Sequence, residues 1–175
     1  MEIIVEKYTD DRLMRRACEM TIDKSSKMPL GKMYKLRHSP MRTQMFWIEL
    51  RGIYSYVSVH FVRHKIGVEH FVKSLRKDRG GDGTEDRYTL VNHGMWINAE
   101  SLITMSHKRL CAHASSDTME VMERITLAVK EVDPDLYLHM VPNCLYIKKC
   151  EERNAQCAPV LARQAKLFDW KNRRV

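Results

Sequence analysis

The stretch SSDTMEVMERITLAVKEVDP, residues 115–134, constrains the fold of this chain more than any other. Its apolar residues recur at helical spacing and form one stripe, which consists of Met119, Met122, Ile125, Val129 and Val132. Ser116 is a suitable cap for the start of this helix. Pro134 ends it, because a proline ring cannot continue the helical hydrogen bonds. The chain must therefore adopt a fold that contains a long amphipathic helix.

Residues 42–52 (RTQMFWIELRG) follow a different period. Their side chains alternate, with Phe46, Ile48 and Leu50 on one face and Trp47, Glu49 and Arg51 on the other. Such alternation predicts a strand. Helical spacing recurs in residues 53–64 (IYSYVSVHFVRH) and 98–114 (NAESLITMSHKRLCAHA).

A further helix is predicted at residues 10–22, with Leu13, Ala17 and Met20 on one stripe. The glycine-rich segment RGGDGTED, residues 79–86, reads as a flexible surface loop that is too short to separate domains. We therefore predict one α+β domain over residues 1–175, mostly helical, with at least one strand before the basic segment described below.

Composition limits the partners and the location. The chain has 30 Lys plus Arg against 22 Asp plus Glu, a formal net charge of +8. This surplus favours anionic partners, including nucleotides and nucleic acid, although a basic surface without a specific partner is equally compatible with it. No run of about eighteen apolar residues exists, so we expect no membrane span. The start MEIIVEKYTDD lacks the pattern of a secretory signal, and the five cysteines then indicate reduced thiols and the cytoplasm.

Residues 60–81 (HFVRHKIGVEHFVKSLRKDRGG) combine many cations with apolar residues, which predicts a half-buried basic segment. The preceding helix delivers Arg63, His64 and Lys65 at its C-terminal end. A guanidinium fork among them can bind a nucleotide phosphate. The alternative is a solvated helix end, where cations also complement the helix dipole.

A second polar group lies in residues 98–114. Arg109 and His113 are four residues apart and share a face if the helix persists. Asn98, a candidate N-cap, lies about three turns before Arg109 on the same side. The three side chains suit a large anionic ligand, and ordinary surface polarity is the alternative.

The third group comprises Cys144, Cys150 and Cys157, with His139 upstream. Three thiolates can hold zinc or an iron–sulfur cluster, whereas buried cysteines that act as small apolar residues are the alternative. The sequence contains no GxGxxG, Walker A, HExxH or GxSxG motif and no evident nucleophile, so chemistry would have to come from a cofactor.

With these residues in view, the chain resembles the flavin-dependent thymidylate synthases, whose signature is RHRxxSxNExSxRY. The matching stretch is RHKIGVEHFVKSLR, residues 63–76. RACEMTI (16–22), LRHSPMRTQMFWIEL (36–50) and NAESLITMSHKRLCAHASSD (98–117) resemble family segments in the same order. The resemblance covers roughly residues 12 to 125.

The resemblance implies a mostly helical fold with a small antiparallel sheet, and a homotetramer with FAD and dUMP at its subunit interfaces. It implies transfer of a one-carbon unit to C5 of a pyrimidine nucleotide, dUMP to dTMP by default, with methylenetetrahydrofolate as carbon donor and NADPH as reductant. The implied cofactor-binding residues are Thr21, His38, Arg63, His64, Lys65, Asn98 and His113. The implied substrate-binding residues are His60, Ser74, Arg76 and Arg109, and the implied catalytic residues are Arg63, His64 and Arg109.

The signature is only partly kept. Its first serine, asparagine, glutamate, second serine and last arginine fall on Val68, His70, Phe71, Lys73 and Leu75. One inserted residue would bring Ser74 and Arg76 into the serine–arginine pair, and His60 replaces a glutamine. Three alternatives follow from these departures: hydroxymethylation, another nucleotide substrate, or a non-catalytic nucleic-acid-binding module on the same scaffold.

Overall fold

The computed structural model describes residues 1–22, 24–81, 83 and 86–152. Its strands are β1 (Glu2–Lys7), β2 (Met45–Tyr54), β3 (Val68–Val72) and β4 (Leu90–Asn98). Its α-helices are α1 (Asp11–Ile22), α2 (Leu30–Lys35), α3 (Ser55–Val62), α4 (Ala99–Arg109), α5 (Ser116–Val132), α6 (Pro134–Tyr137) and α7 (Asn143–Tyr146). Two 3-10 turns, η1 (Ser39–Thr43) and η2 (Lys77–Arg79), complete the described elements. The predicted α+β class, rich in helix with a small sheet, is confirmed.

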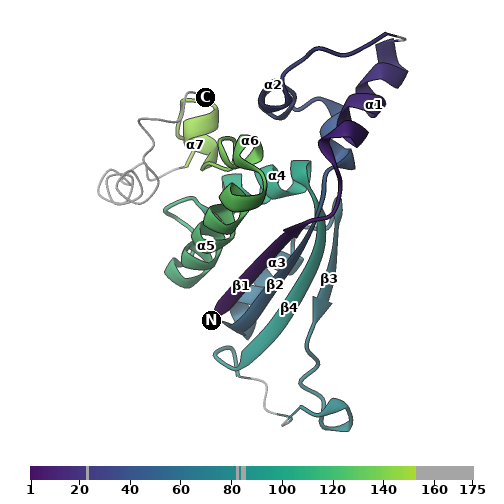
Figure 1. The fold of residues 1–175 in the computed structure, drawn as a ribbon. Coiled ribbons are helices and arrows are strands. Elements are labelled where there is room, and N and C mark those ends of the chain that lie inside the picture. The colour runs from purple at the N-terminus through teal and green to yellow at the C-terminus, as the bar shows by residue number, and fades with distance from the viewer. Residues whose placement is uncertain (23, 82, 84–85, 153–175) are drawn as a thin grey trace.

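The four strands form one antiparallel sheet in the order β1-β2-β4-β3 (Figure 1). The alternation predicted for residues 42–52 is confirmed, because Phe46, Ile48 and Leu50 are buried while Trp47 and Glu49 are on the more open face. Alternate residues of β4 are buried in the same way, and α3, α4 and α5 contact the sheet. The core therefore lies between one face of the sheet and these helices.

The predicted amphipathic helix is confirmed as α5, which begins at Ser116 with Ser115 as its N-cap. Met122, Ile125 and Val129 of the predicted stripe are buried. The stripe predicted for α1 is wrong, because Met14 is buried whereas Met20 is 86% exposed. Met14 and Cys18, one turn apart, face the core instead.

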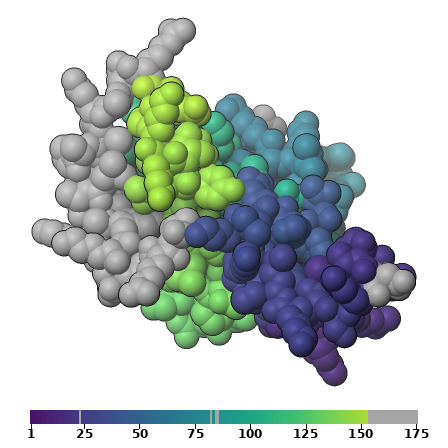
Figure 2. Space-filling view, turned by 90° about the horizontal axis from the view of Figure 1, so that it is seen from above, coloured from purple at the N-terminus to yellow at the C-terminus, as the bar shows by residue number. Residues whose placement is uncertain are grey.

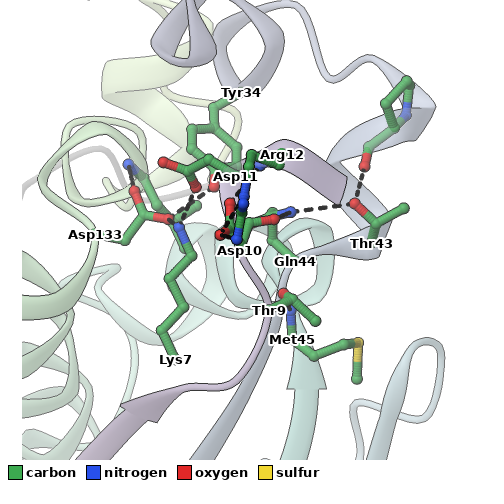
Figure 3. Close-up of polar contacts among 12 residues, drawn as sticks. Lys7, Thr9, Asp10, Asp11, Arg12, Tyr34, Thr43, Gln44, Met45 and Asp133 are labelled. Atoms are coloured by element: carbon green, nitrogen blue, oxygen red, sulfur yellow. Dashed lines mark hydrogen bonds and ion pairs between the residues drawn. The ribbon is translucent and has the colours of Figure 1, made fainter. Parts of the chain in front are cut away.

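A partly buried ionic network ties the end of β1 to the junction between α5 and α6 (Figure 3). Lys7 at the end of β1 pairs with Asp11 and, at 2.9 Å, with Asp133 between α5 and α6. The Tyr34 hydroxyl of α2 donates to Asp133 at 2.8 Å. Burial opposes the charge on Lys7, but the two carboxylates outweigh it and raise the pKa of Lys7. Each buried charge of the network thus has a hydrogen-bonded partner.

Segments that are distant in sequence share one face of the molecule (Figure 2). There the blue region around residues 30–45 lies between the purple N-terminal helix and the yellow-green residues near 140–152. The loop predicted at 79–86 falls between η2 and β4, and residues 82, 84 and 85 are outside the described part. Within the described ranges, no helix combines the length and apolar character needed to cross a membrane.

Candidate functional site

The end of α3 presents the predicted cationic trio to a hollow of about 520 Å³. Arg63 is the C-cap of α3, where the helix dipole favours cations. We call this the basic hollow, and its lining residues are Arg37, Arg42, Arg63, His64, Lys65, Ile66, Glu100, Ser101 and Thr104. The structure thus brings Arg63, His64 and Lys65 together, as the sequence predicted.

The turn after the trio is docked onto the start of α4. Gly67 has a φ of +69°, and a Cβ there would lie 2.3 Å from Nδ2 of Asn98. Asn98 caps α4, as predicted, by accepting from the Ser101 amide at 2.9 Å. The Ser101 hydroxyl in turn donates to the Ile66 carbonyl at 2.5 Å. Only glycine allows this close approach, which fixes the rim of the basic hollow.

Charges in the basic hollow are unevenly paired. Glu100 on α4 pairs with Arg42 and, at 3.7 Å, with Arg37. Arg63 and Lys65 make no ion pair with any residue that the structure describes. Two cations of the hollow therefore have no carboxylate partner within the described chain, so they are available to an anionic ligand.

Arg109, the last residue of α4, joins the two helices at the site. Its Nε donates to Nε2 of His64 at 3.0 Å, and its terminal nitrogen donates to the His60 carbonyl at 2.5 Å. Because Nε2 of His64 accepts, the imidazole proton is on Nδ1. Burial and the charges of Arg109 and His70 lower the pKa of His64 to about 4. His64 is thus held neutral at physiological pH.

A second hollow, of about 430 Å³, runs along the adjoining face of α3. We call it the α3 groove, and its lining residues are Ser55, Tyr56, Val59, His60, Arg63, Leu75, Asp86 and Arg87. The His60 ring contacts the Thr118 hydroxyl at 2.8 Å. Burial, together with Arg109, Arg63 and Arg87, lowers the pKa of His60. Arg63 lines both hollows, so two ligands, one bound in each hollow, would both contact it.

Arg87 is a site residue that the sequence reasoning missed. Its guanidinium lies over the rings of Tyr56, at 4.7 Å, and Tyr88, at 5.2 Å. Such stacking fixes a long side chain at the groove. One signal could have found it, because the arginine–tyrosine pair that ends the family signature occurs at Arg87–Tyr88, beyond the glycine-rich loop.

Several predicted residues lie apart from the two hollows. Arg76 pairs with Asp78 through two contacts, at 2.9 and 2.7 Å, and the Ser74 hydroxyl accepts from the Arg76 amide. Neither Ser74 nor Arg76 lines the α3 groove, so the structure does not bring them together with His60 there, and the cradle from one inserted residue stays a prediction. Thr21 in α1 and His38 before η1 are exposed and line neither hollow.

The prediction that Arg109 and His113 share a helical face is wrong. Helix α4 ends at Arg109, and a turn follows in which the Ala114 amide donates to the Cys111 carbonyl. His113 instead lines a third hollow, of about 350 Å³, together with Arg109, Cys111, Cys144 and Cys150.

Only some of the predicted metal ligands are among the residues that the structure describes. Cys144 and Cys150 line the third hollow, His139 is buried, and Cys157 lies outside the described residues. Among the His, Cys, Asp and Glu side chains that are described, no group of three is placed to hold a metal ion. Metal binding by the cysteine trio stays a prediction.

Comparisons with known proteins place this geometry in context. No family model matches the sequence. No curated protein matches it either. Solved structures do. One is thymidylate synthase X (ThyX) from Helicobacter pylori with FAD and dUMP, which has a TM-score of 0.65 and 14% identity, covering 81% of this chain and 99% of that chain.

A second structure of flavin-dependent ThyX from Helicobacter pylori, complexed with FAD and dUMP, has a TM-score of 0.61 and 15% identity over 81% of this chain and 100% of that one. The UMP/dUMP methylase PolB from Streptomyces cacaoi, bound with 5-Br dUMP, has a TM-score of 0.59 and 12% identity, covering 79% of this chain and 94% of that chain. The chain therefore has the fold of the flavin-dependent thymidylate synthases.

Proposed function

We propose that this protein is a flavin-dependent enzyme that transfers a one-carbon unit to C5 of a pyrimidine nucleotide, by default dUMP. The observation that carries the proposal is the contact of Arg109 with His64, next to Arg63, which lines both hollows. The likeness in fold to structures solved with FAD and dUMP supports the same assignment.

The basic hollow suits the pyrophosphate of FAD. Arg63 and Lys65 supply positive charge that no described carboxylate neutralises, and a guanidinium can bind two phosphate oxygens at once. His64 presents a neutral ring with its proton on Nδ1, which makes it a donor rather than a second cation. These residues fit the cofactor. Reduced FAD would supply the hydride that completes the new methyl group.

The remaining predicted cofactor-binding residues either hold the backbone beside the basic hollow or would contact FAD from a neighbouring subunit. Asn98 acts by capping α4, which holds the turn after Lys65. Thr21, His38 and His113 are exposed, so we assign them to FAD bound mainly by a neighbouring subunit. Two strongly exposed apolar residues beside the hollows, Val59 and Ile66 (90% exposed), favour such coverage by a neighbour. We accordingly propose a homotetramer.

The α3 groove suits the nucleotide. Arg87 is held by two tyrosine rings, so we assign the phosphate to Arg87. His60 lines the groove and Arg109 donates to its carbonyl, so we assign recognition of the base to these two residues. Methylenetetrahydrofolate as carbon donor and NADPH as reductant complete the proposed reaction, which requires no nucleophile from the protein.

A turnover assay tests the proposal. The full-length protein with FAD is incubated with dUMP, methylenetetrahydrofolate and NADPH. The nucleotide products are then separated and identified by mass spectrometry. We expect dTMP. A hydroxymethylated product, or turnover of another pyrimidine nucleotide only, would change the substrate or the product but keep the reaction class. Tight binding of single-stranded nucleic acid without any turnover or FAD binding would contradict the enzyme and support a binding module, which the net charge of +8 also favours.

A further inference from the structure

A chain of hydrogen bonds crosses the core beneath the basic hollow. The Ser58 hydroxyl of α3 contacts Nδ1 of His93 on β4 at 3.0 Å. Nε2 of His93 contacts Nδ1 of His70 on β3 at 2.9 Å. Nε2 of His70 then contacts the backbone carbonyl of His64 at 2.7 Å. The chain thus begins inside α3 and returns to His64, two residues beyond the end of α3.

The direction of these hydrogen bonds is determined by their last member. A carbonyl only accepts, so Nε2 of His70 carries a proton, and the Nδ1 of a neutral His70 is an acceptor. His93 must then donate from Nε2, which leaves its own Nδ1 to accept from the Ser58 hydroxyl. One arrangement of protons therefore satisfies every ring nitrogen in the chain.

The surroundings keep the His93 ring uncharged. Ser58 is buried and His93 is only 1% exposed. Burial and His70 lower the pKa of His93 to about 4. Two ionisable groups lie at its carbonyl end, His64 itself and Arg109, which contacts the His64 ring. The buried His93 ring has fixed partners at both nitrogens, so its arrangement of protons changes only if a proton enters the chain.

The connection between α3 and β3 is anchored at two ends. At the Gly67 end, Asn98 and Ser101 of α4 hold it through the Gly67 carbonyl, at 3.0 Å, and the Ile66 carbonyl. At the other end, His70 holds the carbonyl of His64. Lys65 lies between these anchors and His64 carries one of them, so loss of the His70 contact would release the end that carries the His64 ring.

We propose that His70, supported by His93 and Ser58, is a positioning residue that holds the His64 backbone so that the His64 ring meets Arg109. The role rests on the proposed function only in so far as His64 and Arg109 serve the ligand site. The family signature has an asparagine where this chain has His70, so the relay of imidazoles belongs to this chain rather than to the signature.

The proton arrangement is tested by ¹⁵N spectra of the histidine ring nitrogens in the full-length protein at pH 7, without FAD or nucleotide. We expect a hydrogen on Nε2 of His70 and of His93, and on Nδ1 of His64. A hydrogen on Nδ1 of His93, or a doubly protonated His70, would contradict the chain.

Substitutions test the positioning role. His70→Leu removes both contacts of the ring and should alter the ring signals of His64 and weaken FAD binding by about three- to tenfold, the value of one neutral hydrogen bond. His70→Gln offers an amide that can accept and donate, so it should restore most of the affinity. Glu69→Gln, on the outer face of the same strand, is the matched control and should change neither readout.

Ser58→Ala covers the case in which His70→Leu does not fold. It removes only the first hydroxyl, and we expect the His93 ring signals to lose their single arrangement of protons. If His64 ring signals stay unchanged in every folded variant of His70, the positioning role is wrong. If the ring signals behave as expected and the wild-type protein does not bind FAD, the proposed function fails while the relay stands.

Discussion

Arg109 donates from Nε to Nε2 of His64 at 3.0 Å, although 45 residues separate them in the chain. A guanidinium cannot accept a hydrogen bond, so this contact exists only while Nε2 of His64 is unprotonated. Burial and the neighbouring cation lower the pKa of His64 to about 4, which keeps the contact intact at physiological pH. The pair joins the segment after α3 to α4, next to Arg63, which lines both hollows.

Acid should destabilise the protein before its carboxylates titrate. Burial lowers the pKa of His93 and of His107 to about 4, from an ordinary value near 6.5. The unfolded chain therefore binds more protons than the folded one between these values, so stability falls as pH drops from about 6.5 to 4. Each buried histidine contributes at most about 3 kcal/mol. Urea unfolding at pH 7 and pH 5 measures the loss.

His107 offers a specific variant for this prediction. Its Nε2 is buried without a hydrogen-bond partner among the described residues, and its ring lies 4.7 Å from that of Tyr146. His107→Phe keeps the ring contact and removes the titrating group, so the difference in stability between pH 7 and pH 5 should shrink. An unchanged difference would show that His107 is not neutral in the folded state.

Removing the buried carboxylate at Asp133 should cost much more than removing its tyrosine partner. Asp133→Asn leaves Lys7 with a weaker partner in a buried network, which we expect to cost about 3 kcal/mol of unfolding free energy. Tyr34→Phe removes one hydrogen bond and should cost about 1 kcal/mol. Arg124→Ala breaks an exposed pair with Glu120 and should cost less than about 0.5 kcal/mol. Equal losses in all three variants would contradict the network.

Two glycines with similar backbone angles should respond differently to alanine. Gly67 and Gly80 have φ values of +69° and +79°. An added Cβ would strike Nδ2 of Asn98 at Gly67, whereas at Gly80 no atom of a described residue lies within 4 Å. Gly80→Ala should cost about 1 kcal/mol of backbone strain, and Gly67→Ala about 3 kcal/mol with weaker FAD binding. Circular dichroism melts and FAD titration distinguish the two effects.

Arg87 and Arg76 are alternative candidates for binding the nucleotide phosphate. Arg87→Ala should weaken binding of a pyrimidine monophosphate by about ten- to hundredfold, because a charge-assisted contact is lost. Binding of the corresponding nucleoside should change little. Arg76→Ala, whose guanidinium is paired with Asp78, serves as the control. Calorimetry on the FAD-loaded protein measures both. A larger loss from Arg76 than from Arg87 would restore the inserted-residue alignment of the signature.

The elements that could be predicted from the sequence are those with one clearly buried face and one clearly exposed face. The alternation around Ile48 and the stripe through Ile125 each separate a buried face from an exposed one, so their periods are unambiguous. The cap at Asn98 and the cations at Arg63 follow from local preferences at helix ends. These parts were predictable because local and tertiary requirements agree.

Other parts depend on contacts that no local pattern encodes. Strand β3 was missed because its inward positions include His70, a polar residue that is satisfied only by His93 from another strand. Arg87 reaches the α3 groove from beyond the glycine-rich loop, so its distance in sequence from Arg63 carried no information. The helix that was expected to carry His113 ends one turn early, at Arg109.

Equilibrium titration of FAD, followed by flavin fluorescence, tests the central claim most directly. The full-length wild-type protein should bind FAD. Arg63→Ala should weaken binding by about ten- to hundredfold, because Arg63 is a cation without a carboxylate partner in the described chain and lines both hollows. Arg124→Ala, an exposed cation on α5, should bind FAD as the wild type does. A wild-type protein that binds no FAD at micromolar concentration, or an Arg63→Ala variant that binds it equally well, would contradict the account.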